Sequence, residues 1–508
     1  MSLVTNRLPN RLPNRLPQSL PNRLTQSLPN RLTQSLTNRL TQHLNQYLTY
    51  GLLIFLLPVF FFSCKEDPPV ITPPIDTPID SLYVPDPDPP AYGTPFNGVP
   101  ATEDVIMYEV NLRAFSPGGD LAGVEARLDS IQSLGINVIW LMPIHPIGAI
   151  NSVNSPYSVA NYKEVGEEYG TLDDLRSLVQ AAHERGIAVI LDWVANHTAW
   201  DNPWMSRPEW YTQVNGEVVH PPGTGWLDVA DLNFSNQDMQ TAMISALKFW
   251  ILAANADGYR CDAADYVPYS FWKRALDTLS NMPGRDVMLL AEGQRSDHFT
   301  AGFQMNYSWS FYGRVKDAFN GGSAVTLMST SQSELSGVPA TKQKLRFTTN
   351  HDESAWDATP VELFGSIDAA FAASVLATTI GGVPLIYGSQ EVGRATPLPF
   401  FWNTPINWNE NPDLLARYRK LLNTYSQSEA LKTEALTDGS DEHVVAFRKD
   451  AGAESAVVLV NLRETTQTYS VPVEWQGSIW QNALDNQTDT LYNTLDLEGH
   501  GVRLLVKP

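Results

Sequence analysis

Eight short apolar segments, separated by stretches of helical periodicity, constrain the fold of this chain most strongly. Strands that alternate with helices pair in parallel, and eight consecutive units favour closure into a (β/α)8 TIM barrel over an open doubly wound sheet. Gly135 and Gly186 lie where helix C-caps are expected. The apolar segments are residues 105–110, 136–141, 187–192, 257–262, 287–292, 303–308, 345–350 and 383–388.

Composition divides the rest of the chain into further segments. Residues 101–432 hold the predicted barrel, and residues 433–508 alternate apolar and polar positions, which predicts a C-terminal antiparallel β-sandwich. Residues 64–100 are rich in Pro and Asp and predict an extended tether. The connection at residues 198–233 has little helical period and many aromatic residues, so we expect a short irregular excursion over the barrel mouth after the third strand.

The first 63 residues predict an export signal rather than a domain. Residues 6–45 repeat with a period of eight, which is too short for a solenoid. The hydrophobic run at 48–63 is short and interrupted by Pro, as in a secretory signal peptide. Cys64 follows Ser63, so the segment resembles a bacterial lipoprotein signal with lipidation at Cys64. The alternative is an uncleaved anchor. Both interpretations place the body outside the cytoplasm, and lipidation would attach it to a bacterial outer membrane or cell surface.

Charge excludes nucleic acid as a partner. The chain carries a net charge of −21, and its first 63 residues contain six Arg and no acidic residue, so the body is more acidic still. Phosphate binding needs basic surface. We expect a monomer that acts on a neutral substrate and contacts a membrane only through the lipid. Cys64 and Cys261 are the two cysteines, and we expect no disulfide between them.

Charged residues follow several of the predicted strands. Arg260 and Asp262 end the fourth, and their spacing of two puts both side chains on one face of a strand. We expect the guanidinium to keep the carboxylate ionised by lowering its pKa. Asp192 ends the third strand and Glu292 the fifth. Each alone fits a structural role, such as an Arg–Asp pair or a helix cap.

The predicted seventh strand ends in Asn350, His351 and Asp352. The carboxyl ends of all barrel strands meet at one rim, where active sites of such barrels lie. We therefore expect these residues to converge with the charged residues of the third, fourth and fifth strands on one catalytic site.

Four ordered motifs resemble the α-amylase family, glycoside hydrolase family 13. They are DWVANHT (192–198), GYRCDAADY (258–266), LLAEG (289–293) and FTTNHDE (347–353), and weaker matches are GINVIWLMPI (135–144), DLN (231–233) and GGVPLIYGSQE (381–391). The resemblance covers about residues 104–508. It implies that Asp262 is the nucleophile, Glu292 the general acid/base and Asp352 the group that stabilises the transition state. Such a retaining double displacement needs the two reacting carboxyl groups about 5–5.5 Å apart.

The resemblance also implies a set of substrate-binding residues. Tyr157 would stack on the sugar ring, and His197 and His351 would bind its hydroxyls. Arg260 would stand beside the nucleophile, with Asp192 supporting it from behind. The apolar neighbours of Glu292 in its strand suit an acid of raised pKa.

Two positions depart from the family pattern. Asp265 and Tyr266 stand where relatives often have Lys-His, and that His lends a carbonyl to a calcium ion and its side chain to a reducing-side subsite. The resemblance implies a calcium site at Asn196 and Asp231, which this departure alters.

The implied activity is hydrolysis of α-1,4-glucosidic bonds in starch or maltooligosaccharides. The alternatives are a neopullulanase or cyclomaltodextrinase, an α-glucosidase, or an enzyme that transfers glycosyl units among small α-glucosides. A non-catalytic glucan-binding protein is a remote alternative, because such relatives lose catalytic acids and this chain keeps Asp262, Glu292 and Asp352.

Overall fold

The computed structural model of the chain describes residues 83–507. The predicted repeat, signal peptide and Cys64 lie outside the described residues, as does the tether before residue 83. Within the described residues, no helix has both the length and the apolar character to cross a membrane.

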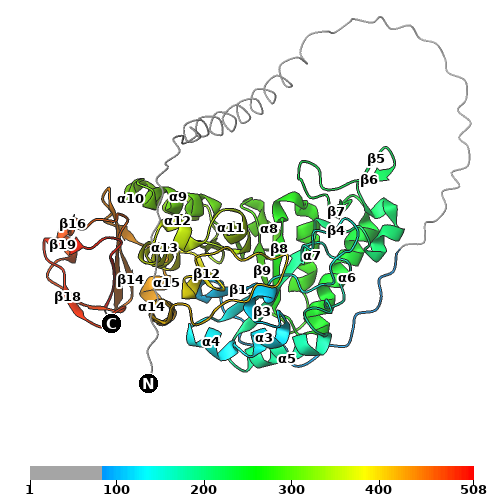
Figure 1. Cartoon of the computed structure of the whole chain (residues 1–508), viewed down its shortest axis with the longest axis horizontal. Helices are drawn as coiled ribbons and strands as arrows, with labels where there is room; N and C mark the ends of the chain where they lie inside the picture. Colours follow the sequence, from blue (N-terminus) through cyan, green and yellow to red (C-terminus); the bar gives the residue numbers. More distant parts are fainter. Residues whose placement is uncertain (1–82, 508) are drawn as a thin grey trace, which may run out of the picture. The chain divides into compact units, whose positions relative to one another are not determined.

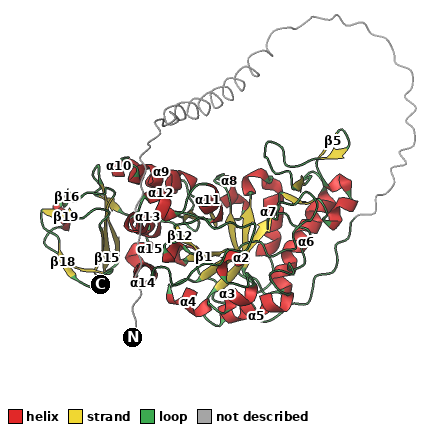
Figure 2. Ribbon diagram, viewed as in Figure 1, coloured by secondary structure: helices red, strands yellow, loops and turns green. Residues whose placement is uncertain are grey.

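Eight parallel strands close into a barrel, as predicted (Figures 1 and 2). Around the barrel their order is β1-β12-β11-β10-β9-β8-β3-β2. The strands are β1 (Met107–Val110), β2 (Val138–Leu141), β3 (Ala188–Val194), β8 (Gly258–Asp262), β9 (Met288–Ala291), β10 (Met305–Tyr307), β11 (Gln343–Arg346) and β12 (Val383–Tyr387).

Helices connect the strands on the outside of the barrel (Figure 2). Gly135 and Gly186 end the helical segments before β2 and β3 with φ of +87° and +74°, the left-handed conformation that glycine adopts without strain. The α-helices are α2 (Leu112–Phe115), α3 (Leu121–Glu125), α4 (Leu128–Ser133), α5 (Leu172–His183), α6 (Gln237–Ala253), α7 (Tyr269–Ser280), α8 (Asp297–Ala301), α9 (Trp309–Phe319), α10 (Ala324–Leu335), α11 (His351–Trp356), α12 (Pro360–Phe364), α13 (Ile367–Thr379), α14 (Pro412–Gln427) and α15 (Glu429–Lys432).

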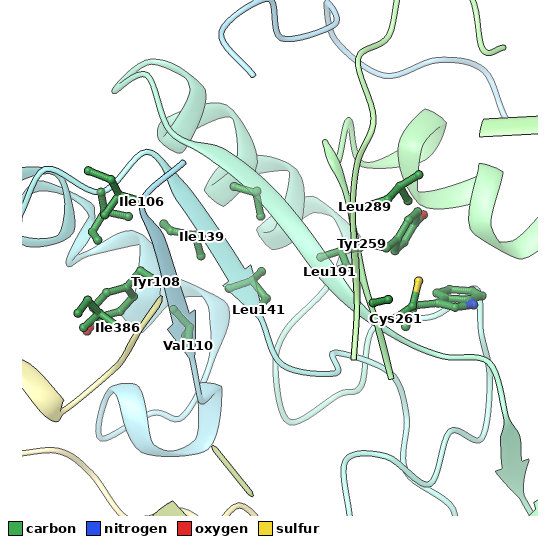
Figure 3. Close-up of a cluster of buried hydrophobic side chains, with 14 of the residues drawn as sticks. Ile106, Tyr108, Val110, Ile139, Leu141, Leu191, Tyr259, Cys261, Leu289 and Ile386 are labelled. Carbon is green, nitrogen blue, oxygen red and sulfur yellow. The ribbon is translucent and has the colours of Figure 1, made fainter. Parts of the chain in front are cut away.

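Alternate residues of each strand serve two different cores. Tyr108, Leu191 and Cys261 face outward and pack in the layer between strands and helices (Figure 3). Their neighbours Met107 and Ile190 face the barrel interior, which is a separate apolar cluster. Because the side-chain period of a strand is two, the same alternation turns charged residues near the strand ends into the barrel.

The seventh strand is shorter than predicted and begins earlier. We predicted residues 345–350, whereas β11 is Gln343–Arg346. Asn350 instead caps α11, and its side chain accepts a hydrogen bond of 2.9 Å from the backbone N–H of Glu353. The N-cap is worth about 1 kcal/mol to a helix, so the segment after Arg346 leaves the sheet and places His351 and Asp352 in the first turn of α11.

The excursion after β3 contains more regular structure than its sequence indicates. β4 (His197–Ala199) pairs antiparallel with β7 (Val229–Asp231). Between them lie two 3-10 turns, η2 (Pro203–Ser206) and η3 (Pro208–Trp210), and the hairpin of β5 (Gln213–Val214) and β6 (Glu217–Val218).

The C-terminal part is an antiparallel β domain that contacts α10, α13 and α15 (Figure 1). One six-stranded sheet has the order β13-β14-β15-β20-β17-β18, and β16 pairs with β19 to form a second, smaller sheet. The antiparallel β domain predicted for residues 433–508 is confirmed. The strands are β13 (Thr437–Asp438), β14 (Val444–Ala451), β15 (Glu454–Asn461), β16 (Gln467–Ser470), β17 (Ile479–Asn482), β18 (Thr488–Thr490), β19 (Thr494–Leu497) and β20 (Val502–Lys507).

Candidate active site

Arg260 is the centre of a charged cluster at the carboxyl ends of the strands. Its Nη1 lies 3.0 Å from Asp262 Oδ1 and 2.9 Å from Asp192 Oδ1, and its Nη2 lies 3.0 Å from Glu292 Oε1. The guanidinium is completely buried, and its Nε donates to the hydroxyl of Tyr307 at 3.3 Å. Three carboxylates from three strand ends therefore share one cation.

Glu292 follows β9 directly, and its carboxyl has the raised pKa expected of a general acid. Burial raises the pKa of its carboxyl to about 7, and the attraction of Arg260 only partly opposes that shift. The backbone N–H of Ala263 donates to Glu292 Oε2 at 2.6 Å, which fixes the side chain beside the end of β8. The raised pKa that the sequence indicated is confirmed.

The expected lowering of the pKa of Asp262 is wrong. Burial raises the pKa of this carboxyl to about 6, and Arg260 reduces the shift without reversing it. The carboxylates of Asp192 and Asp352 also raise it. Even so, the pKa of Asp262 stays below that of Glu292, so between these values Asp262 is ionised while Glu292 keeps its proton.

His351 links two carboxylates on the opposite side of the site. Its Nε2 lies 3.3 Å from Asp352 Oδ2, and its Nδ1 donates to Glu109 Oε1. Burial lowers the pKa of this imidazole, but Asp352 and Glu109 outweigh that effect and raise the pKa to about 9. His351 is therefore an imidazolium at neutral pH.

Sequence reasoning missed Glu109 and Trp140. Glu109 lies in β1 with no exposed surface, and Trp140 in β2 donates its indole N–H to Asp192 Oδ2 at 3.0 Å. A single acid inside the apolar segment 105–110 was the available signal for Glu109. Nothing in the sequence around Trp140 distinguished it from an ordinary core residue.

Tyr157 connects the two halves of the site. Its hydroxyl donates to Asp192 Oδ2 at 3.2 Å and lies 2.7 Å from His351 Nε2. Its ring stacks on that of His351 with 5.3 Å between the centroids and 18° between the planes. Contacts on both sides therefore hold the ring in a fixed orientation.

His197 lies at the start of β4 and is neutral, because burial lowers the pKa of its imidazole to about 4. Its ring lies 5.5 Å from that of Trp226. A neutral imidazole can donate one hydrogen bond and accept another, as recognition of a sugar hydroxyl requires.

A cavity of about 430 Å³ opens over this cluster. It is lined by the predicted catalytic acids Asp262, Glu292 and Asp352 and by the predicted binding residues Tyr157, His197 and His351. The structure thus brings six of the predicted site residues to one cavity, while Arg260 and Asp192 lie beneath it. Four aromatic residues form part of the remaining wall, namely Trp226, Trp356, Phe400 and Phe401.

The predicted calcium residues would supply part of a ligand set. Asn196 is buried, and its amide Nδ2 lies 3.2 Å from His197 Nδ1. Asp231 ends β7, and Thr212 donates to its carboxylate. Calcium takes six to eight oxygen ligands. Asn196 and Asp231 would supply two of these, and backbone carbonyl oxygens and waters would supply the others.

The two positions that depart from the family pattern face different surroundings. Tyr266 is 58% exposed, and its ring lies 5.7 Å from that of Trp226. Asp265 turns toward the loop after β9 and approaches His298, with Oδ1 3.3 Å from Nε2.

Comparison with known proteins finds α-amylases. Residues 71–215 match the α-amylase catalytic-domain family. The chain is 26% identical over 409 residues to the α-amylase MalA of Haloarcula japonica, covering 76% of this chain and 59% of that protein. It is 28% identical over 362 residues to α-amylase 3 of Dictyoglomus thermophilum, covering 63% and 70%.

Solved structures give the same result. An α-amylase from Lactobacillus plantarum has a TM-score of 0.73 and 27% identity, covering 80% of this chain and 99% of that one. A noncanonic maltogenic α-amylase, AmyB, from Thermotoga neapolitana has a TM-score of 0.71 and 25% identity, covering 80% and 98%.

A closed barrel with carboxyl groups of neighbouring strand ends beside one buried arginine fits a glycoside hydrolase, the class to which the α-amylases matched above belong. In view of these matches, the chain is similar to α-amylases along most of its length, and residues 71–215 match the α-amylase catalytic-domain family.

Proposed function

We propose that this protein hydrolyses α-1,4-glucosidic bonds of starch or maltooligosaccharides by a retaining double displacement. The observation that carries the proposal is the placement of Asp262, Glu292 and Asp352 along one cavity at the ends of the barrel strands. Asp262 and Glu292 contact the same guanidinium, which holds them side by side. Burial raises the pKa of Glu292 to about 7, which suits a group that gives a proton to the leaving sugar.

The reaction then has two steps. Asp262 attacks the anomeric carbon while Glu292 gives its proton to the glycosidic oxygen, so the bond to the leaving sugar breaks and a covalent glycosyl–aspartate ester forms. In the second step Glu292, now ionised, takes a proton from water as that water attacks the same carbon. This releases Asp262 and restores the proton on Glu292, and the product keeps the anomeric configuration of the substrate.

The residues around the acids orient the sugar and stabilise the charge that develops on it. The ring of Tyr157 offers a flat apolar face to the sugar being cleaved. His351, as an imidazolium, holds the carboxylate of Asp352 in place, so that Asp352 can stabilise the oxocarbenium-like transition state. His197 supplies a neutral hydrogen-bonding ring.

Aromatic residues on two opposite sides of the barrel mouth favour the binding of a long substrate. Trp226 and Tyr266 follow β3 and β8, whereas Trp356 and Phe400 follow β11 and β12, on the opposite side of the barrel. Trp356 is 67% exposed. Exposed rings on either side of the acids provide stacking surfaces for sugars beyond the cleaved bond, which favours cleavage inside a chain.

An enzyme on small α-glucosides is the second candidate. It would cleave cyclodextrins, pullulan or α-1,6 bonds, trim chain ends or transfer glycosyl units. The short excursion between β3 and β8 favours it, because fewer residues are available to bind a polymer. Among the relatives are proteins named probable oligo-1,6-glucosidase 2 of Bacillus subtilis and trehalose synthase/amylase TreS of Mycobacterium tuberculosis.

Product analysis with amylose, pullulan, cyclodextrin and maltotriose separates the two candidates. Internal cleavage of amylose, seen as a fall in viscosity before reducing ends accumulate, is the expected result. Activity confined to short or cyclic substrates would contradict it. No activity on any of them would favour the non-catalytic alternative.

We also propose that the protein is lipid-anchored at Cys64 on the outside of a bacterial cell and acts there as a monomer. The hydrophobic run and Ser63-Cys64 support the anchor, and the Pro- and Asp-rich residues 65–82 support a spacer. The predicted tether is shorter than 64–100, because residues 83–100 pack on the barrel, where the N–H of Tyr92 donates to the carbonyl of Leu252 at 2.8 Å and Phe96 stacks on His183. Expression of the full chain and of C64S tests the lipid anchor. The native chain should fractionate with membranes and C64S should be soluble; equal fractionation would contradict lipidation.

A further inference from the structure

The loop after Glu292 is joined to the loop after Asp262 through the carboxylate of Asp265. Oδ2 of Asp265 lies 3.3 Å from the backbone N of Gln294, and Oδ1 lies 3.4 Å from the backbone N of Arg295. Both N–H groups belong to the chain that leaves Glu292. One carboxylate therefore accepts from two successive amides of that loop.

Arg295 and His298 make further contacts between the loop after Glu292 and the segment after β8. Arg295 donates from Nη1 to the backbone carbonyls of Asp265 at 2.8 Å and Val267 at 3.2 Å. The side chain of His298 is fully buried, and its Nε2 lies 3.3 Å from Asp265 Oδ1. Four groups from the β9 loop and α8 thus converge on the segment after β8.

The approach is close enough to require glycine next to Glu292. Gly293 has φ of +148°, and a Cβ atom there would lie 2.4 Å from Asp265 Oδ1. Glu292 itself is held by its backbone N–H to the carbonyl of Cys261 at 2.9 Å and by its carbonyl to the N–H of Ala264 at 3.0 Å. The Asp265 contact adds to these by fixing the stretch of backbone that follows Glu292.

We propose that Asp265 is a positioning residue that holds Glu292 in the position and orientation needed for proton transfer to the glycosidic oxygen. The inference rests on the proposed function. Asp265 is not among the described residues that line the cavity, whereas Asp262, Ala263 and Glu292 are. It therefore acts through Glu292 and does not contact the sugar. Asp265 is one of the two positions that depart from the family pattern. Its role is to support the general acid and not to bind substrate.

A displaced general acid has a distinctive kinetic effect. Formation of the glycosyl–aspartate ester needs a proton on the leaving group only when that group is a poor one, such as a sugar hydroxyl. Fluoride leaves without protonation. Loss of the support should therefore slow this step for a maltooligosaccharide and spare it for α-maltosyl fluoride.

The test measures kcat/KM for both substrates, because this ratio reports the first irreversible step. For D265N we expect kcat/KM on maltotriose to fall about tenfold to a hundredfold, the size of a loss caused by a misplaced general acid. On α-maltosyl fluoride it should change by less than about threefold, since no proton transfer is lost there. R295A removes the contact from the other side and should show the same selectivity if D265N folds poorly.

D257N is the matched control. Asp257 precedes β8 at the other end of the barrel, where its Oδ2 accepts from the backbone N–H of Val189 at 2.7 Å and lies 2.8 Å from His183 Nε2. It is another buried aspartate paired with a histidine and a backbone amide. D257N should lower the Tm without changing the ratio of the two kcat/KM values.

Equal losses on both substrates in D265N and R295A would overturn the proposal, as would no loss on either. If the unmodified protein cleaves neither maltotriose nor α-maltosyl fluoride, the proposed function fails before the role of Asp265 is reached.

Discussion

Replacing Glu109 with Gln should lower the pKa of His351, so that this side chain loses its positive charge near neutral pH. The carboxylate of Glu109 is buried behind the imidazole, accepts from its Nδ1 and helps raise its pKa from the ordinary 6.5 to about 9. One pKa unit corresponds to about 1.4 kcal/mol, so the net shift represents about 3.5 kcal/mol in favour of the imidazolium. Asp352 and Glu109 together supply this net shift and also offset the opposing effect of burial.

The pKa of His351 in E109Q should therefore fall well below about 9, because only Asp352 then opposes the effect of burial. The imidazole then loses its proton near neutral pH and releases the carboxylate of Asp352. We expect kcat/KM at pH 8 to fall about tenfold or more, with a smaller loss at pH 6, where the imidazole is still charged. Imidazole NMR of labelled protein gives the pKa, and kcat/KM measured across pH gives the consequence.

E391Q is the control for this prediction. Glu391 is a buried carboxylate at the same rim, but it accepts from the hydroxyl of Tyr108 and from the backbone N–H of Ser389 and not from His351. It should lower stability without moving the pKa of His351. An unchanged His351 pKa in E109Q, or the same change in E391Q, would refute the role given to Glu109.

Three further outcomes follow from the site. The kcat/KM profile should fall below about pH 6, where Asp262 takes up a proton, and above about pH 7, where Glu292 loses one; a profile flat from pH 4 to 9 would contradict the assignment. Chelation with EDTA should lower the Tm by several degrees where Asn196 and Asp231 hold a structural calcium ion, and an unchanged Tm would count against that ion. Y266A should raise KM for amylose about two- to tenfold and leave maltotriose unaffected, whereas equal effects would count against the long-substrate reading.

The charged residues at the strand ends could be predicted because a parallel barrel gathers those ends at one rim. Asp262 and Glu292 were placed from their positions after apolar segments alone. The pKa direction of Asp262 was wrong because sequence spacing shows the neighbouring arginine but not the depth of burial, and burial dominates here.

Glu109 was missed for a related reason. Its importance lies in a contact with a residue 242 positions away, and only closure of the barrel brings β1 beside α11. The early end of β11 was missed because the cap of Asn350 competes with an apolar segment that otherwise fits a strand.

The most direct test of the account is to trap the glycosyl–enzyme ester. Incubation with 5-fluoro-α-D-glucosyl fluoride, which forms the ester and slows its hydrolysis, should leave one glycosyl group on the protein. Peptide mass spectrometry should place it on Asp262. Attachment to Glu292 or Asp352, or release of a product with inverted anomeric configuration, would contradict Asp262 as the nucleophile.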